Sequence, residues 1–259
     1  MSSKRQTNSA GLRRDIELLE VLGKYEAEHK SGLGVIRIAE MAGREKTQVS
    51  RALTTLAEQG LVDRDPNTMF YRLGWRLYAL SAQTFEAHLT SVAAPYLRRL
   101  AELAQETTHL CVLRHDEVLT ISTAAPAHGF RAVWEGLTSP APSTSAGRVL
   151  LCEWDETSLA AKWTPEALAD VTGQRIFKTT EELSEELKKV RQQGFSVVDE
   201  EFEIGVVGCS APIRDASGRI VAALNIGAPK ARLITKLDQA ARLTRKVANE
   251  LSQTLYSPS

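Results

Sequence analysis

The sequence predicts an α+β protein: an N-terminal winged helix-turn-helix, a linker helix, and a larger C-terminal domain with a central antiparallel sheet flanked by helices. Two observations predict this class. Three stretches with helical apolar spacing precede two short strands near the N-terminus, and strands and helices follow one another over the rest of the 259 residues. That length is enough for two compact domains. The expected organisation is a disordered arm at 1–10, a winged helix-turn-helix at 11–74, a linker helix at 75–89 and a second domain at 90–259.

The first domain is expected to hold three helices and a hairpin. An apolar series with helical spacing runs from Leu12 to about His29. Two further helices each end at a glycine, Gly43 and Gly60. The expected bounds of these two helices and of the two hairpin strands are 35–42, 45–59, 61–64 and 70–73. The sequence Asp-Pro-Asn-Thr at 65–68 is typical of the turn between such strands.

The linker helix carries more large apolar residues than one small helix face can bury. These residues are Trp75, Tyr78, Leu80 and Phe85. We therefore expect a second copy of the chain to pack against this helix.

The second domain is expected to begin near Thr90 with a helix and to end with a long helix that includes Leu233 and Leu255. Strands are expected between them at 109–114, 117–124, 130–136, 195–199, 206–213 and 220–227. Further helices are expected at about 144–152, 155–162 and 180–192. A central antiparallel sheet covered by helices is the simplest arrangement of these elements.

The composition is that of a globular protein, with 43% hydrophobic and 25% charged residues. No apolar run approaches the ~18 residues of a membrane-spanning helix, and the polar first ten residues hold no apolar signal core. We therefore expect a cytoplasmic protein. The three cysteines, Cys111, Cys152 and Cys209, form no CxxC pair, so we expect reduced thiols.

The net charge of the chain is zero, but the charge is unevenly distributed. Residues 1–80 hold 13 Lys and Arg against 10 Asp and Glu, a net charge of +3, which leaves −3 for the rest. This asymmetry favours a nucleic-acid partner for the N-terminal part.

The third helix of the first domain has the pattern of a recognition helix. Val49, Leu53 and Leu56 share one face, which is expected to pack on the other two helices. Polar residues on the opposite side near the helix start are expected to reach base edges in the major groove: Lys46, Thr47, Gln48, Ser50 and Arg51. Four further cations are expected to meet phosphates: Arg37, Arg44, Arg64 and Arg72.

Two other interpretations of this helix remain open. A charged helix face is often simply solvated, and a winged helix can serve protein contacts alone. The succession of helix, glycine, helix, glycine and hairpin favours double-stranded DNA as the partner.

No pattern of catalytic residues is present, so we expect no enzyme activity, no cofactor and no metal. The five histidines show no metal-ligand spacing, and the GxSxG, Walker and GxGxxG motifs are absent. Glu200, Glu201 and Glu203 are expected to form an acidic surface loop. The alternative is an enzyme with an accessory winged helix, which would turn over its ligand, whereas a regulator would return the ligand unchanged.

Six motifs follow one another in order along the chain: KTxVxRxLxxLxxxGxV at 46–62, YxLG at 71–74, SAGRVLL at 145–151, GFSxxDEExxxG at 194–205, APIxDxxG at 211–218 and AALNIG at 222–227. They give the sequence, from Leu12 to Leu255, a resemblance to a known family, the IclR transcriptional regulators. It implies a GAF-like effector domain and homo-oligomers, dimers often paired into tetramers, on palindromic operators. It also implies a small-metabolite effector, commonly an organic acid, a sugar acid or an aromatic compound. Members repress or activate, and we favour repression.

The resemblance also implies where the effector binds: around the helix that starts near residue 145, before Gly205, and on the last two strands. The residues at those positions are Ser145, Ala146, Asp199, Gly208, Cys209, Asn225 and Gly227. Ser143 and Gly147 are added because free N–H groups at the start of this helix can bind an anion, and Trp134 is added as an apolar wall. This chain departs from the better-known organic-acid sensors, which commonly carry hydroxyl residues on the last strand. With Asn225 and Gly227 there, and Gly208 beside them, we expect a roomier pocket and a ligand larger than a two- or three-carbon acid.

Several of these residues have a second interpretation. Ser143 or Thr144 can serve as a plain N-cap and need not frame an anion site. Trp134 fits an ordinary core or dimer-contact residue as well as a pocket wall. Cys209 is in principle a redox sensor, although buried strand cysteines are usually inert, which is the interpretation we favour.

Overall fold

The computed structural model describes residues 10–127, 134–169, 171 and 177–256. The chain divides into two compact units, Met1–Ala87 and His88–Ser259. Apart from Ala10, which begins the first helix, the expected disordered arm lies outside the described residues.

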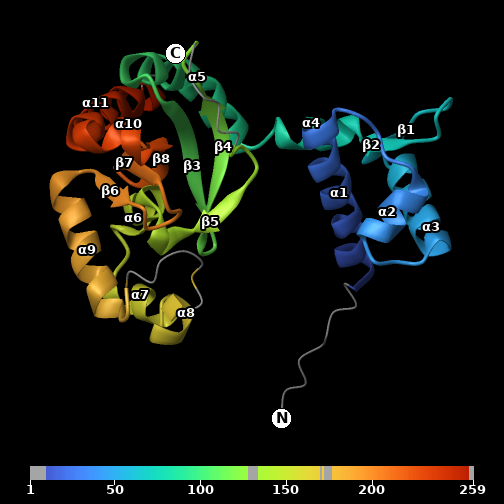
Figure 1. The fold of residues 1–259 in the computed structure, drawn as a ribbon, viewed down its shortest axis with the longest axis horizontal. Helices are drawn as coiled ribbons and strands as arrows, with labels where there is room; N and C mark the ends of the chain where they lie inside the picture. Colours follow the sequence, from blue (N-terminus) through green and yellow to red (C-terminus); the bar gives the residue numbers. More distant parts are fainter. Residues whose placement is uncertain (1–9, 128–133, 170, 172–176, 257–259) are drawn as a thin grey trace. The chain divides into compact units, whose positions relative to one another are not determined.

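The first unit is a winged helix-turn-helix, as the sequence predicts (Figure 1). Its elements are α1 (Ala10–His29), α2 (Val35–Met41), α3 (Lys46–Glu58), β1 (Val62–Arg64) and β2 (Tyr71–Leu73). The two strands pair antiparallel, with Val62 opposite Leu73. Leu18, Ile38 and Leu53 from the three helices are fully buried in a common core. This core fixes α3 with one side against the protein and the other side free.

The expectation of one continuous linker helix is wrong. α4 (Trp75–Ser81) ends before α5 (Phe85–Ala104) begins. α5 also includes the residues of the separate helix that was expected from Thr90. Side-chain hydroxyls cause the break by competing for main-chain groups. The Thr84 hydroxyl donates to the Ser81 carbonyl at 2.7 Å and accepts from the Ala87 N–H at 3.3 Å, which starts a new helix.

The second unit is built on a six-stranded antiparallel sheet with the strand order β5-β4-β3-β8-β7-β6. The strands are β3 (Thr107–Arg114), β4 (Glu117–Ala124), β5 (Thr138–Pro140), β6 (Ser196–Asp199), β7 (Val206–Arg214) and β8 (Ile220–Pro229). After α5, the helical elements are η1 (Ala141–Ser143), α6 (Ser145–Leu151), α7 (Glu156–Lys162), α8 (Pro165–Ala169), α9 (Thr180–Gln193), α10 (Lys230–Leu233), η2 (Ile234–Lys236) and α11 (Leu237–Tyr256).

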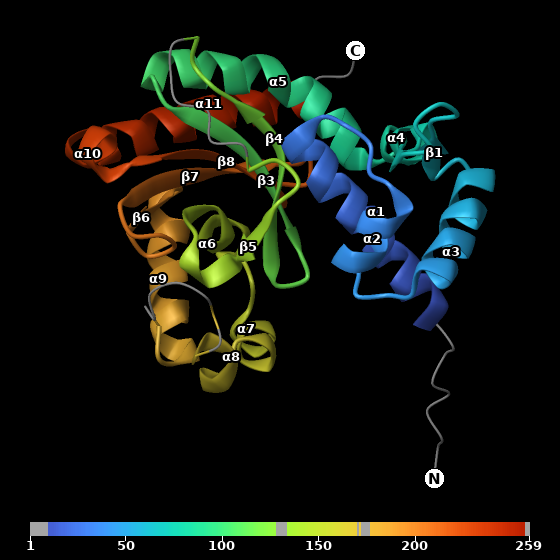
Figure 2. The same cartoon turned by 45° about the vertical axis from the view of Figure 1, so that its right-hand side comes forward.

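Helices cover both faces of this sheet, as the sequence predicts. Figure 2 shows α5 and α11 side by side over one face, with α6 and α9 on the other. The alternation of strand residues supplies both cores. Leu224 faces α5 and α11, whereas its neighbour Ala223 packs with Cys111 and the α6 side.

The expected strand at 130–136 is wrong where it can be compared. Residues 130–133 lie outside the described part, and Trp134 to Gly136 form a turn in which the Leu137 N–H donates to the Trp134 carbonyl at 3.0 Å. Gly136 has a φ of +81°, which suits glycine and ends a strand. The edge strand β5 begins two residues later. The helix α8 was not expected, and the long C-terminal helix begins at Leu237 and not at Leu233.

Among the described helices, none is both long enough and apolar enough to cross a lipid bilayer.

The helix α6 lies so close to η1 that residue 147 has no room for a side chain. A Cβ atom on Gly147 would overlap the carbonyl group of Ala141. We expect Gly147→Ala to reduce the free energy of unfolding by about 3 kcal/mol, because main-chain atoms cannot swing aside. Urea unfolding followed by the fluorescence of the tryptophans would measure this.

Gly11→Ala is the matched control, because a methyl group there meets nothing within 4 Å and lies in a helix. A Gly147→Ala variant as stable as Gly11→Ala would contradict the close approach of α6 to η1.

Candidate functional site

The outer side of α3 is free, as expected for a surface that contacts a partner. Val49, Leu53 and Leu56 are buried against the core. The expected base-reading side chains on the other side are exposed, except Ser50, which is half-buried: Lys46, Thr47, Gln48 and Arg51.

The start of α3 is capped by an acidic side chain. The carboxylate of Glu45 accepts from the N–H groups of Thr47 at 2.9 Å and Gln48 at 3.1 Å. The hydrogen bond from the Thr47 N–H lowers the pKa of Glu45 most. These two N–H groups therefore already have a hydrogen-bond acceptor. Contacts between this end of α3 and a partner must be made by side chains.

The four cations expected at phosphates are in different situations. Arg64 and Arg72 are exposed on the two wing strands, and the Arg64 guanidinium lies 5.3 Å from the ring centre of Tyr71. Arg37 is exposed and forms an ion pair with Glu40 at 3.0 Å.

Arg44 differs from the other three cations. It is half-buried, and its Nη1 donates to the carbonyl of Arg14 at 2.7 Å. This inward bond joins the turn before α3 to α1 and is a structural contact.

A cavity of about 450 Å³ lies in the second unit between the sheet and α6. Side chains from β3, β4, β7, β8, α6 and the segment before β7 line it. Six of the ten residues expected at an effector site line this cavity: Trp134, Ser145, Ala146, Gly208, Asn225 and Gly227.

A hydrogen-bonded cluster closes the inner end of the cavity. The Asn225 Nδ2 donates to Ser145 Oγ at 3.2 Å, Ser210 Oγ at 2.9 Å and the Cys209 carbonyl at 3.2 Å. The two serine hydroxyls lie 2.8 Å apart. The cluster joins the first residue of α6 to the two central strands and fixes the orientation of the Asn225 amide.

Two glycines leave the floor of the cavity without side chains. Gly208 on β7 and Gly227 on β8 are direct cross-strand partners. A Cβ atom on Gly227 would make only ordinary van der Waals contacts, the nearest at 3.7 Å. The room that the sequence predicts is therefore present at Gly227, whereas a Cβ atom on Gly208 would lie only 3.1 Å from the Ile226 carbonyl oxygen.

Aromatic rings lie at another part of the cavity wall. The rings of Trp134 and Phe202 are 5.3 Å apart and tilted by 58°. Next to Phe202 in the sequence, Glu201 pairs with the buried Arg148 of α6, which also donates to the Pro142 carbonyl at 3.0 Å. Arg148 thereby holds the segment that carries Phe202.

Charged groups are few in the described cavity lining and consist of Glu203 and Arg232. Arg232 is in turn paired with Glu106, which is buried at the start of β3. The remaining lining is neutral, so the cavity suits a ligand with a large apolar part and few polar groups.

Four expected effector residues do not line the cavity. The Ser143 hydroxyl donates to the Pro140 carbonyl at 3.0 Å, so it stabilises η1. Gly147 allows α6 to approach η1, as described above. The N-cap of α6 is the neighbouring Thr144, which does line the cavity and whose hydroxyl accepts from the Gly147 N–H at 3.0 Å.

Asp199 and Cys209 point elsewhere. Asp199 forms an ion pair with Lys230 at 2.8 Å, and Lys230 also bonds Glu200, lowering the pKa of that carboxyl. The Cys209 Sγ lies 3.7 Å from the Thr244 hydroxyl in the α11 core, and burial raises its pKa to about 12. It is therefore a poor nucleophile.

His109, Thr120 and Arg232 line the cavity but were not predicted, because the histidines were weighed only as metal ligands. Thr107, His109 and Cys111 lie on one face of β3 and line the cavity, whereas Leu110 and Val112 belong to the core under α5 and α11. The period of two along a strand, read from Leu110 and Val112, was the signal that could have placed His109 on the cavity side.

In the described part of the chain, no group of three or more His, Cys, Asp or Glu side chains is placed to hold a metal ion.

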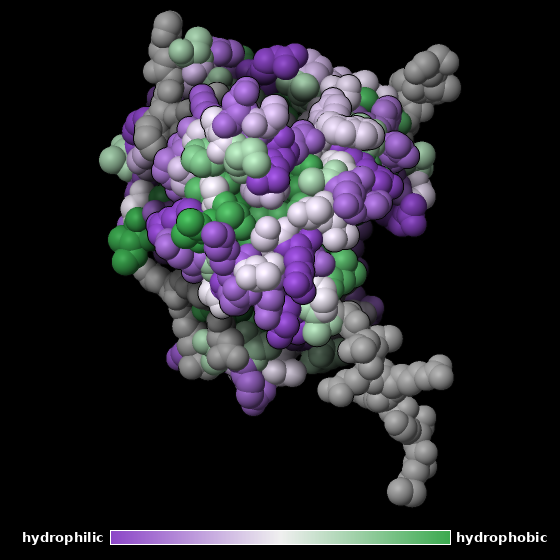
Figure 3. All heavy atoms as spheres, turned by 90° about the vertical axis from the view of Figure 1, so that its right-hand side faces the viewer, coloured by the Kyte–Doolittle hydropathy of each residue, from purple (hydrophilic) through white to green (hydrophobic). Residues whose placement is uncertain are grey.

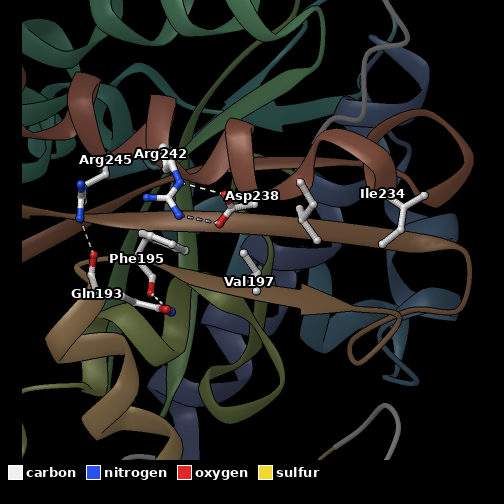
Figure 4. Close-up of a pocket in the computed structure, with 8 residues that line it drawn as sticks. Gln193, Phe195, Val197, Ile234, Asp238, Arg242 and Arg245 are labelled. Atoms are coloured by element: carbon white, nitrogen blue, oxygen red, sulfur yellow. Dashed lines mark hydrogen bonds and ion pairs between the residues drawn. The ribbon is translucent and has the colours of Figure 1, made fainter.

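A second hollow, of about 590 Å³, lies between β6 and α11 on the other side of the sheet (Figure 4). Its polar groups bond one another. Arg242 pairs with Asp238 at 2.9 Å, and Arg245 donates to the Gln193 carbonyl at 2.7 Å. The first cavity, with its converging buried polar groups, is the better ligand site.

The comparisons with known proteins agree over both units. Residues 12–66 match the IclR helix-turn-helix domain, and residues 82–253 match the C-terminal domain of the bacterial transcriptional regulator IclR.

Among curated proteins, a Pca regulon regulatory protein of Pseudomonas putida is 33% identical, over 77% of this chain and 68% of its own length. A p-hydroxybenzoate hydroxylase transcriptional activator of Acinetobacter baylyi is 29% identical, over 93% of this chain and 90% of its own length.

Solved structures share the fold. An IclR homologue of Microbacterium hydrocarbonoxydans, complexed with 4-hydroxybenzoate, has a TM-score of 0.78 at 21% identity, covering 96% of this chain and 100% of that one. The structure of the protein RHA06195 of Rhodococcus sp. RHA1 has a TM-score of 0.70 at 26% identity, covering 95% of this chain and 97% of that one.

Proposed function

The chain belongs to the IclR family of DNA-binding bacterial transcriptional regulators, and we propose that an aromatic acid bound in the cavity of its larger unit controls its binding to an operator. The observation that carries this proposal is the cavity itself, which is largely neutral, has an aromatic wall, and closes on a polar cluster around Asn225.

The proposed DNA contacts follow from the exposed side of α3. The side chains of Thr47, Gln48 and Arg51 would read base edges, because a recognition helix enters the major groove by its N-terminal residues. Lys46 and Ser50 would lie beside them. Arg64 and Arg72 on the wing, with Arg37, would contact phosphates. Arg44 would act indirectly, by fixing the turn before α3 against α1.

The size and polarity of the cavity support an aromatic effector. A volume of about 450 Å³ is within the range of small-molecule pockets, and a two- or three-carbon acid would leave much of it unfilled. The Acinetobacter relative is named as the transcriptional activator of p-hydroxybenzoate hydroxylase, and the Microbacterium structure holds 4-hydroxybenzoate. An aromatic ring would lie between the glycine floor and the wall formed by Trp134 and Phe202.

Control by the ligand requires that it bind one conformation of the protein better than another. The operator affinity can change only by that difference in affinity. α5 is a rigid element in this respect, since Leu89, Leu97 and Leu100 are fully buried on the sheet. A ligand that shifts the strands under α5 would therefore shift α5. We favour repression, in which the ligand releases the operator and is itself unchanged. Because operator DNA lies in the bacterial cytoplasm, we propose that the protein acts there.

We propose that the chain forms at least a homodimer through the linker region. Four large apolar side chains are exposed there: Trp75, Tyr78, Leu80 and Phe85. On the face shown in Figure 3, green hydrophobic residues are interspersed among purple hydrophilic ones. A dimer would present two copies of α3 to major grooves about one helical turn, ~34 Å, apart.

The DNA contacts can be tested with a duplex selected from a random library. Arg51→Ala is expected to cost about 1–3 kcal/mol of binding free energy and to relax base preference. Arg64→Ala is expected to weaken all duplexes alike and to reduce the slope of log K against log salt by about 1. Gel-shift titrations at several salt concentrations would separate the two effects.

Lys24→Ala, which removes an exposed cation from α1, is the control for a general loss of charge. Wild-type affinity in both arginine variants would rule out this docking of α3 and the wing.

The effector class can be tested by calorimetric titration of benzoate, 4-hydroxybenzoate, pyruvate and glyoxylate, each repeated with the operator present. An aromatic acid is expected to bind and to weaken operator binding. Trp134→Ala should lower the affinity for the aromatic acid about 10-fold, since an aromatic contact contributes roughly 0.5–1.5 kcal/mol in addition to the burial of its surface area. Ile234→Ala, which alters only the second hollow, should have no effect. Tight binding of pyruvate or glyoxylate alone would refute an aromatic effector.

The linker contact can be tested by sedimentation velocity. Tyr78→Glu places a charge on a residue that is 79% exposed, so the fold of a single chain should tolerate it, whereas a dimer contact would lose stability. The expected result is a lower dimer fraction at a given concentration. Ile204→Glu, at a residue 78% exposed in the second unit, is the matched control. An unchanged dimer fraction in Tyr78→Glu would place the contact elsewhere.

A further inference from the structure

His109 is a buried polar group of the cavity to which the proposed function gives no role. It lies on β3 and is only 5% exposed. Its Nδ1 is 3.1 Å from the Thr123 hydroxyl on the neighbouring strand. The ring is therefore held by one nitrogen and offers the other, Nε2, on its far side.

The free nitrogen of His109 lies beside the floor of the cavity. A Cβ atom placed on Gly227 would be 3.7 Å from the His109 Nε2 and also 3.7 Å from the Asn225 Oδ1. All three hydrogen bonds of the Asn225 amide with described residues run through its nitrogen, so this oxygen is the end of the amide that remains for a ligand. Two polar atoms from different strands thus converge on one small space, which exists because residue 227 has no side chain.

Asn225 Oδ1 and His109 Nε2 have complementary hydrogen-bonding roles, one as an acceptor and the other as a donor. Asn225 Oδ1 can only accept a hydrogen bond. Burial lowers the pKa of His109 to about 4, so the imidazole is neutral at physiological pH. The Thr123 hydroxyl can donate to Nδ1, and His109 then carries its proton on Nε2 and donates into the cavity.

A hydroxyl group matches this pair of atoms. Its hydrogen can be donated to Asn225 Oδ1 while its oxygen accepts from His109 Nε2–H. A carboxylate in the same space could accept from His109, but its lone pairs would face those of Asn225 Oδ1. The charge would also lie in a buried place without a facing cation, which is unfavourable.

We propose that His109 and Asn225 together bind a hydroxyl group of the effector above Gly227, so that the preferred ligand is a hydroxylated aromatic acid. This inference rests on the proposed function, which supplies the aromatic acid and the cavity. His109 is then the group that distinguishes a hydroxylated ring from the same ring without the hydroxyl.

The other titratable groups of the cavity do not account for a preference for the hydroxylated ring. Arg232 of α10 is paired with Glu106 of β3, and Glu203 lies in the segment before β7. Cys111, on the same face of β3, stays a thiol because burial raises its pKa to about 12. The carboxylate of the ligand would then lie away from His109, toward Arg232, the arginine of the described cavity lining.

The inference can be tested with a pair of ligands that differ only in the hydroxyl, 4-hydroxybenzoate and benzoate. The wild-type protein is expected to bind 4-hydroxybenzoate about 10- to 100-fold more tightly, because benzoate leaves two buried polar atoms unpaired. His109→Phe should reduce this ratio to about 3-fold or less with little change in benzoate affinity. His109→Gln should retain much of the ratio, because the amide nitrogen can donate from near the position of Nε2.

Two further variants separate binding from folding. Gly227→Ala adds a methyl group where the nearest atoms are 3.7 Å away, so the fold should be kept while the hydroxyl loses its space. It should also lower the ratio of the two affinities. His115→Asn replaces an exposed histidine at a φ of +58° on the β3–β4 turn, where asparagine is tolerated, and should leave the ratio unchanged.

The pH dependence distinguishes a hydroxyl from a carboxylate at His109. A bound anion would raise the pKa of His109 from its low value, so binding would take up a proton and the affinity would fall as the pH rises through that new pKa. A neutral hydroxyl leaves His109 uncharged, so the affinity should be constant between about pH 6 and 8. Calorimetry in two buffers of different ionisation enthalpy would count the protons.

The outcomes are distinct. Equal wild-type affinity for the two acids, a ratio that survives His109→Phe, or proton uptake on binding would each overturn the hydroxyl site and leave the aromatic effector standing. Binding of neither acid would overturn the aromatic effector and the hydroxyl site together.

Discussion

The larger unit depends on one buried contact, the bonds that Asn225 makes to Ser145 and Ser210. They join the first residue of α6 to the two central strands, β7 and β8, at the inner end of the cavity. A buried polar cluster of this kind is costly unless every member is bonded. Satisfying Ser145 and Ser210 therefore fixes how far α6 lies from the sheet, and with it the depth of the cavity. The same bonds leave the oxygen of Asn225 beside Gly227.

The alternation of strand residues decides which side chains reach that cavity. Along β7, Gly208 and Ser210 lie on the side of α6, whereas Cys209 between them is buried in the α11 core. The side chains of neighbouring strand residues point to opposite faces of the sheet. This is why the expectation for Gly208 agrees with the cavity lining and the expectation for Cys209 does not. On β3, the same rule brings His109 in and turns Leu110 away.

The sequence predicts well where a pattern acts locally. α3, with Val49, Leu53 and Leu56 buried on one side, begins and ends within one or two residues of its expected bounds, and so do the central strands. It fails where a single side chain redirects the chain, as when the Thr84 hydroxyl starts a new helix. It also fails where distant segments meet. Neither the overlap that excludes a side chain at Gly147 nor the partners of His109 can be inferred from neighbours in sequence.

The carboxylate of Glu45 at the start of α3 has a consequence for how such a protein would search a chromosome. A helix N-terminus ordinarily attracts phosphate groups, and here a fixed negative charge takes that position. Attraction to the sugar-phosphate chain, which is the same at every site, would then be weakened, whereas the proposed contacts from Arg51 to a correct base would not. Residence on random sequences would be shortened, and a larger share of the molecules would be free to find the few true sites.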